Sequence, residues 1–177
     1  MVQKMKDDGF AYVSDGALVV DVKEDTDTKE IPPCMILKSD GASLYNTTDL
    51  ATIVWREEDY DPDEIIYVVD KRQELHFVQV FRCARKTGLV KPETELKFLG
   101  FGTMNGKDGK PFKTRDGGVM RLEYLVSEID NEMLKKITEN QKAKENLGIS
   151  EEEAKETAKT VALAAVSYTH LTLPTIL

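Results

Sequence analysis

The sequence has little cysteine and no long apolar run, and each absence excludes a class of protein. Its 177 residues include two cysteines, Cys34 and Cys83, whose separation matches no spacing of metal ligands. We therefore expect free thiols in a reducing cytoplasm and no protein-bound metal. No stretch approaches the roughly 18 apolar residues of a membrane-spanning helix, so we expect no membrane partner. Residues 1–8 are not followed by the apolar core of a signal peptide.

An excess of positive charge is also absent. The chain carries 32 acidic and 24 basic residues, which gives a net charge of −8 at pH 7. This balance argues against a general affinity for nucleic acid, because most of the surface would repel a polyanion. It does not exclude a local basic site, and residues 107–115 are the one dense cluster of lysine and arginine.

Residues 106–118 combine this basic cluster with four glycines, directly after an apolar run at residues 96–101. Glycines let backbone amides approach a polyanion, and lysines neutralise it. The two common phosphate-binding patterns are nevertheless missing, because neither the Walker A spacing nor the Gly-x-Gly-x-x-Gly spacing fits. What remains is Lys110-x-x-Lys113-Thr114, which by itself is as consistent with a solvated turn as with a triphosphate clamp.

The hydrophobic pattern predicts an α/β fold. Short apolar runs predict strands, and apolar residues three and four apart predict helices. Residues 42–101 alternate in the order β-α-β-α-β, which predicts parallel strands joined by right-handed crossovers. The predicted strands are residues 17–22, 34–37, 42–45, 65–69 and 96–101, and the predicted helices are residues 2–9, 49–60, 75–88, 122–137 and 151–165.

Some elements carry finer predictions. The β-branched run at residues 65–69 is typical of a strand covered on both faces. Thr48 and Asp49 form a predicted helix N-cap. Ser150 begins a predicted capping box that ends at Glu153. The predicted apolar faces are Leu75, Val78 and Phe81 on one crossover helix, and Ala154, Ala158, Val161 and Ala165 on the last helix.

Polar residues follow the predicted parallel strands, where ligands of such sheets bind. They form three clusters, at residues 45–49, 70–73 and 102–114. Because the carboxyl ends of parallel strands lie at the same edge, we expect the clusters to converge on one rim. This rim is the candidate active site.

Several segments around these strand ends resemble bacterial arginyl-tRNA synthetases, which are class I aminoacyl-tRNA synthetases. The similarity extends from about Asp15 to Ala165. Lys110-x-x-Lys113-Thr114 resembles the KMSKS signature loop of that class, with Thr114 at the place of serine. The other matching segments are residues 43–49 (SLYNTTD), 66–73 (IYVVDKRQ), 76–79 (HFVQ) and 101–106 (FGTMNG).

The resemblance implies the C-terminal half of a Rossmann-like parallel sheet, followed by the start of an α-helical domain. It implies a ligase that activates arginine with ATP, releases pyrophosphate and transfers the arginyl group to the 3′ end of its tRNA. ATP enters as a substrate with Mg2+, and no bound prosthetic group is implied. The implied partners of the complete enzyme are arginine, ATP and the arginine tRNAs, and we expect a cytoplasmic monomer.

The resemblance also implies roles for individual residues. Without it, Asp49 is better explained as a plain N-cap, and Tyr45 as a core aromatic at a strand end. His76 and Gln79 could likewise be a surface pair on one helix. The implied contacts are Tyr45, Asp49 and Gln73 for arginine; His76, Gln79, Gly102, Thr103 and Met104 for ATP and adenosine; and Lys110, Lys113 and Thr114 for catalysis.

The implied domain organisation has four parts. Residues 1–41 end the segment that precedes the second catalytic half, and residues 42–118 form that half, with its signature loop at residues 106–118. Residues 119–165 are a helical connector and the start of the anticodon-binding domain. Residues 166–177 resemble the translation of a sequencing adapter, and we exclude them from the fold.

Two alternatives remain open from the sequence. The family's His-x-Gly-His signature is absent here, so we expect an internal segment of the enzyme that is inactive alone. One alternative is a non-catalytic nucleotide-binding module derived from a class I synthetase. The other is a class I synthetase for a different amino acid, and the pairing of Tyr45 with an acidic Asp49 argues against it.

Overall fold

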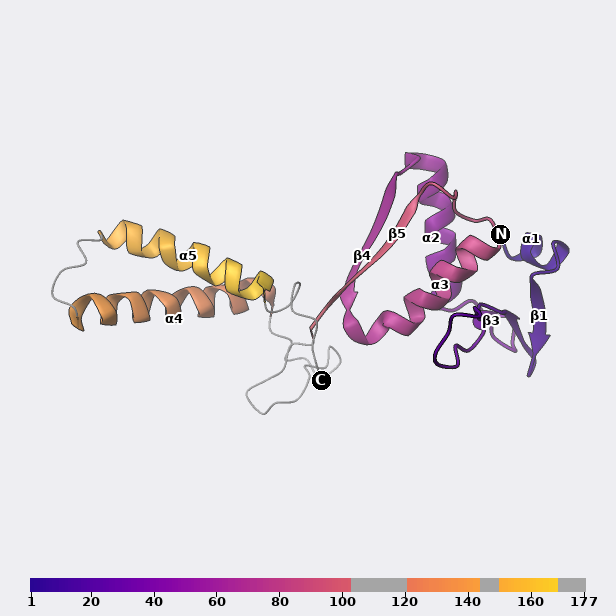
Figure 1. Ribbon diagram of the computed structural model, residues 1–177, viewed down its shortest axis with the longest axis horizontal. Coiled ribbons are helices and arrows are strands. Elements are labelled where there is room, and N and C mark those ends of the chain that lie inside the picture. Colours follow the sequence, from indigo (N-terminus) through magenta and orange to yellow (C-terminus); the bar gives the residue numbers. More distant parts are fainter. Residues whose placement is uncertain (103–120, 144–149, 169–177) are drawn as a thin grey trace. The chain divides into compact units, whose positions relative to one another are not determined.

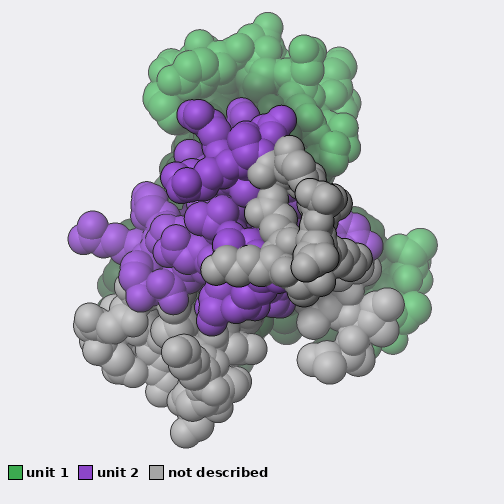
Figure 2. All heavy atoms as spheres, turned by 90° about the vertical axis from the view of Figure 1, so that its left-hand side faces the viewer, with its two compact units in different colours: residues 1–100 green, residues 101–177 purple. Residues whose placement is uncertain are grey.

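The computed structural model describes residues 1–102, 121–143 and 150–168. The chain divides into two compact units, residues 1–100 and residues 101–177, which Figure 2 draws in green and purple. The first unit is mixed α/β, and the described part of the second is a pair of helices (Figure 1). None of the described helices has the length and apolarity that a membrane crossing requires.

The first unit begins with helix α1 (Val2–Asp7) and a three-stranded antiparallel sheet. The strands are β1 (Ala11–Ser14), β2 (Ala17–Val20) and β3 (Cys34–Leu37), in the order β1-β2-β3. Asp15 and Gly16 both have positive φ angles, 48° and 80°, as the two-residue turn between β1 and β2 requires. The predictions for α1, β2 and β3 are confirmed, whereas β1 was not predicted.

The predicted strand at residues 42–45 is wrong. The Lys38 amide donates to the Ala42 carbonyl at 2.9 Å and closes a turn, and the chain then enters helix α2 (Tyr45–Tyr60) directly. This helix begins before the predicted N-cap, because Thr47 Oγ1 accepts a hydrogen bond from the Leu44 amide at 3.0 Å and stabilises the first turn. Asp49 therefore lies inside α2 and does not cap it.

The following β-α-β unit is confirmed. Strand β4 (Glu64–Asp70) leads through a short 3-10 helix, η1 (Lys71–Gln73), into α3 (Glu74–Lys86) and then β5 (Glu95–Phe101). β4 and β5 are neighbours in a parallel sheet, as expected when a helix joins two adjacent strands. The carboxyl ends of both strands therefore lie at the same edge of this sheet.

A single apolar core joins both sheets to α2 and α3. Both cysteines are free and fully buried in it, and Asn46 Nδ2 lies 3.3 Å from Cys34 Sγ. The core draws its buried side chains from α1, β2, β3, α2, β4 and α3. Its side chains include Met5, Leu18, Val20, Cys34, Ile36, Leu50, Ile53, Ile65, Val80, Cys83 and Ala84.

The buried face of α3 differs from the predicted one. Phe77, Val80 and Cys83 are buried, whereas Leu75 is 47% exposed. Both sets of residues repeat at helical spacing, so spacing alone does not choose between them. The ring of Phe77 decides the orientation, because it packs against Tyr67 of β4 and Phe98 of β5, with ring centroids 4.7 and 5.8 Å away.

Within the part of the chain that the structure describes, strand β4 is covered on one face only, contrary to the prediction. Ile65 is 5% exposed and faces the core, whereas Ile66 and Val68 are 48% and 55% exposed. Leu99 of β5 is 42% exposed as well. We call Ile66, Val68 and Leu99 the open face of the sheet.

The second unit contains α4 (Leu122–Ala143) and α5 (Glu151–Ser167), which pack against each other. The predicted capping box is confirmed, since Ser150 Oγ accepts from the Glu153 amide at 3.2 Å and Glu153 Oε2 accepts from the Ser150 amide at 2.8 Å. The buried face of α5 is Ala154, Ala158 and Ala162. Val161, which was predicted to be buried, is 42% exposed.

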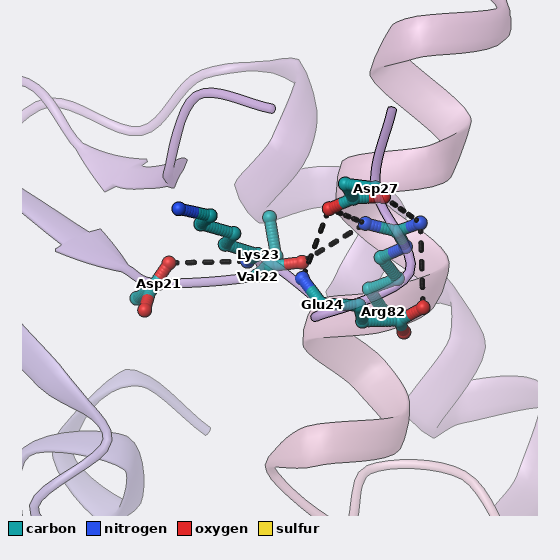
Figure 3. Close-up of polar contacts among 6 residues, drawn as sticks. All are labelled: Asp21, Val22, Lys23, Glu24, Asp27 and Arg82. Carbon is teal, nitrogen blue, oxygen red and sulfur yellow. Dashed lines mark hydrogen bonds and ion pairs between the residues drawn. The ribbon is translucent and has the colours of Figure 1, made fainter. Parts of the chain in front are cut away.

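Arg82 of α3 fastens the loop that connects β2 and β3 (Figure 3). Its guanidinium donates to Asp27 Oδ1 and Oδ2 at 2.7 and 2.8 Å and also to the Val22 carbonyl at 3.2 Å. Asp27 accepts a further hydrogen bond from the Glu24 amide, and its side chain is only 7% exposed. These contacts, with the Arg82 hydrogen bonds foremost, lower the pKa of Asp27 from its ordinary 3.8 to about 2.

Replacing Asp27 with Asn should lower the melting temperature at neutral pH, because the ion pair with Arg82 is lost. The folded-state pKa lies below the ordinary value, so the contribution is complete above about pH 4 and is lost as the pH falls through about 2. The difference between wild type and Asp27→Asn should shrink over that interval in thermal melts. Asp25→Asn, at an exposed neighbouring position, is the matched control. A difference that is constant down to pH 2 would contradict the assignment.

Candidate active site

Asp49 and His76 lie on neighbouring helices and are in contact. His76 Nε2 is 2.6 Å from Asp49 Oδ2. The two side chains are 28% and 23% exposed, so solvent reaches both of them. A carboxylate can only accept, so Nε2 carries the hydrogen and donates it. The structure therefore joins a residue predicted to contact arginine to one predicted to contact ATP.

An aromatic cluster packs against the His76 side of this pair. Phe77 is 4% exposed and contacts Tyr67, Phe81 and Phe98 at ring-centroid distances of 4.7, 5.6 and 5.8 Å. The His76 ring meets the Phe77 ring edge to face at 5.0 Å. Such edge-to-face contacts are favourable and directional, so they restrict the orientation of the imidazole.

Tyr67 of β4 links the cluster to α2. The Arg56 guanidinium carbon lies 5.1 Å from the centroid of the Tyr67 ring, in a cation–π arrangement. The Tyr67 hydroxyl is buried and has no hydrogen-bond partner among the described residues. Burial raises the pKa of Tyr67; Arg56 opposes this shift, and the negative charge of Asp49 adds to it.

The other predicted residues of the first unit occupy separate positions. Tyr45 is the first residue of α2 and is 83% exposed, so it is not the core aromatic that one alternative proposed. Gln73 ends η1 and is the N-cap of α3. Gln79 Nε2 donates to the carbonyls of Pro32 and Pro33 at 2.8 and 3.2 Å, so its partners differ from that of His76.

The predicted residues at the end of β5 are described only in part. Gly102 follows β5 directly and is partly exposed. Thr103, Met104, Lys110, Lys113 and Thr114 lie outside the described residues, so convergence of the three polar clusters remains a prediction. Within residues 1–102, 121–143 and 150–168, no group of three or more His, Cys, Asp or Glu side chains is placed to hold a metal ion.

Comparison with known families shows which family the chain belongs to. The family described as "tRNA synthetases class I (R), catalytic domain" matches residues 1–175. The chain belongs to the class I arginyl-tRNA synthetase family. The resemblance inferred from the motifs around Tyr45, Asp49 and His76 is thereby confirmed at the level of the family.

Two curated relatives of this synthetase segment carry the name arginine–tRNA ligase. The one from Agathobacter rectalis is 74% identical over 168 residues, and the one from Alkaliphilus oremlandii is 56% identical over the same length. Each match covers 95% of this chain and 28% of the relative. The chain thus spans a little over a quarter of the length of the relatives it matches.

Solved structures show that the synthetase fold is shared. Arginyl-tRNA synthetase from Plasmodium falciparum matches 94% of this chain and 26% of its own, with a TM-score of 0.61 and 19% identity. The enzyme from Thermus thermophilus matches 94% of this chain and 32% of its own, with the same TM-score and 18% identity.

Sequence reasoning on this synthetase segment named Asp49 and His76 but missed their contact. The two residues are 27 positions apart, and no spacing relates them. It also gave no role to Tyr67 and Phe77, which support the pair. The orientation of α3 was the missing information, because the predicted inner face began at Leu75 and not at Phe77.

Replacing Tyr67 with Phe should leave the melting temperature unchanged or raise it, because the change removes a buried hydroxyl without a partner and keeps the ring contacts. In an alkaline absorbance titration the variant should also lose a tyrosine that ionises at higher pH than free tyrosine, because burial raises the pKa of Tyr67. Tyr60→Phe, at a position that is 66% exposed, is the control. A clear loss of thermal stability in Tyr67→Phe alone would show that the hydroxyl is bonded.

Proposed function

We propose that the complete protein containing this segment is an arginine–tRNA ligase. Two curated relatives with this name, at 74% and 56% identity, carry the proposal. The segment spans 28% of their length, so the activity belongs to the complete protein. A non-catalytic nucleotide-binding module is not favoured, because both relatives are named as ligases.

The proposed arginine site consists of Tyr45, Asp49 and Gln73. A guanidinium is planar and permanently charged, so a carboxylate binds it with two parallel hydrogen bonds and an aromatic ring stacks on its plane. Tyr45 and Asp49 suit these roles because they lie four residues apart on α2 and therefore on one side of the helix. The exposed side chain of Gln73 can add a polar contact from the start of α3.

The proposed chemistry requires ATP, which enters with Mg2+ on its phosphates. A carboxylate oxygen of arginine attacks the α-phosphorus, and the bond to pyrophosphate breaks. Lys113, with Lys110 and Thr114, is proposed to stabilise the negative charge of the departing pyrophosphate, a type of contribution worth about 10²- to 10³-fold in rate. His76, Gln79, Gly102, Thr103 and Met104 are proposed to border the ATP and adenosine pocket.

In the second step, the terminal adenosine of tRNA attacks the arginyl carbonyl, and AMP leaves. The proposed partners of the complete enzyme are therefore arginine, ATP and the arginine tRNAs. We propose that it acts in the cytoplasm as a monomer. Two free, buried thiols are compatible with a reducing compartment.

The complete enzyme should charge tRNA with arginine and with no other standard amino acid. Reconstructing the full gene and measuring ATP-dependent charging with each amino acid in turn tests this directly. Preferential charging of a different amino acid would refute the assignment of the substrate.

Replacing Asp49 with Ala in the complete enzyme should raise the Michaelis constant for arginine by roughly 10- to 150-fold, because hydrogen bonds to a charged group are lost. The Michaelis constant for ATP should change little. Asp59→Ala, at an exposed position near the end of the same helix, is the matched control. An unchanged Michaelis constant for arginine would remove Asp49 from the substrate site.

A further inference from the structure

We propose that His76 is a positioning residue that holds the Asp49 carboxylate ready for a guanidinium. This inference rests on the proposed function, because it takes Asp49 as the ligand of the arginine side chain. It gives His76 a role that reaches arginine through Asp49. A place at the border of the ATP and adenosine pocket is compatible with this role; the competing role is a direct hydrogen bond from His76 to adenosine in place of the one to Asp49.

The first observation is the short hydrogen bond between the two side chains. Nε2 of His76 and Oδ2 of Asp49 are 2.6 Å apart. Among the described residues, the Asp49 carboxylate accepts no hydrogen bond from any other side chain. A carboxylate has about four lone-pair positions, so accepting one hydrogen bond at Oδ2 leaves Oδ1 and part of Oδ2 for a bidentate guanidinium. The bond therefore restricts the carboxylate without using up its acceptor capacity.

The second observation is that the imidazole is itself held in place. His76 lies in the first turn of α3, and its ring packs edge to face on Phe77, at 5.0 Å and an interplanar angle of 87°. Phe77 is 4% exposed and is fixed between β4 and β5 by Tyr67 and Phe98. The sheet thus holds Phe77, Phe77 restricts the imidazole of His76, and His76 restricts the carboxylate of Asp49.

Such support matters because an Asp side chain on a helix surface otherwise samples several rotamers. Binding would then have to immobilise the carboxylate, and that loss of freedom weakens affinity. A carboxylate that is already held can form both guanidinium bonds with little reorganisation. His76 should therefore affect the binding of arginine much more than the rate of the chemical step.

The test compares His76→Ala, His76→Gln and His76→Asn in the complete enzyme. The terminal nitrogen of Gln reaches roughly as far as Nε2 of His, whereas that of Asn corresponds to Nδ1. His76→Ala and His76→Asn should raise the Michaelis constant for arginine by about tenfold or more, with a smaller change in kcat and in the Michaelis constant for ATP. His76→Gln should restore most of the arginine affinity.

A double-mutant cycle with Asp49→Ala distinguishes positioning of Asp49 from a purely structural role of His76, because Ala offers no acceptor to His76. In the Asp49→Ala background, His76→Ala should weaken arginine binding little further, because its effect passes through the carboxylate. Leu75→Ala, also in the first turn of α3, controls for general disturbance of that turn. Should His76→Ala fail to fold, the comparison of His76→Gln with His76→Asn carries the test.

Three results would overturn the inference. The first is additive losses in the cycle, and the second is equal arginine affinity in His76→Gln and His76→Asn. The third is a raised Michaelis constant for ATP with unchanged arginine binding, which would establish the adenosine contact. A wild-type enzyme that charges another amino acid would instead refute the proposed function, and this inference with it.

Discussion

The packing of Phe77 against β4 and β5 sets the orientation of α3, and most of the first unit depends on that orientation. Successive residues of a helix are rotated by roughly 100°, so fixing one residue fixes its neighbours. With Phe77 inward, His76 meets Asp49 of α2, Val80 and Cys83 enter the shared core, and Arg82 reaches Asp27 on the loop between β2 and β3. One aromatic contact thus positions both the candidate site and the ion pair that fastens the loop.

Much of the fold could be predicted from the sequence because several signals are local. The β-branched run became β4, and Ser150 with Glu153 caps α5, since both signals act within a few residues. The errors arose where a distant contact decides the outcome. Thr47 starts α2 early by accepting a hydrogen bond from the Leu44 amide and donating one to the Ile36 carbonyl of β3. The inner face of α3 was chosen by Tyr67 and Phe98, which no helical periodicity can reveal.

The candidate site was predictable residue by residue but not as an arrangement. The motifs around Asp49 and His76 indicated a class I synthetase, and family membership is confirmed over residues 1–175. The motifs assigned these two residues to different ligands, because a motif records residue types along the chain and not contacts between helices. The solved relatives, at 18% and 19% identity, support the fold of the segment. The side-chain contacts between Asp49 and His76 come from the structure of this chain.

The open face of Ile66, Val68 and Leu99 affects how the isolated segment behaves in solution. Among the described residues, β4 and β5 pair with each other, so each presents a second edge of backbone donors and acceptors beside exposed apolar side chains. Such an edge is a template for further strands, and in solution the nearest source is another copy of the same segment. Association between copies, more than the free energy of its own core, should then determine whether the isolated segment stays in solution. A further layer of polypeptide that covered the open face and these strand edges would keep the segment in solution.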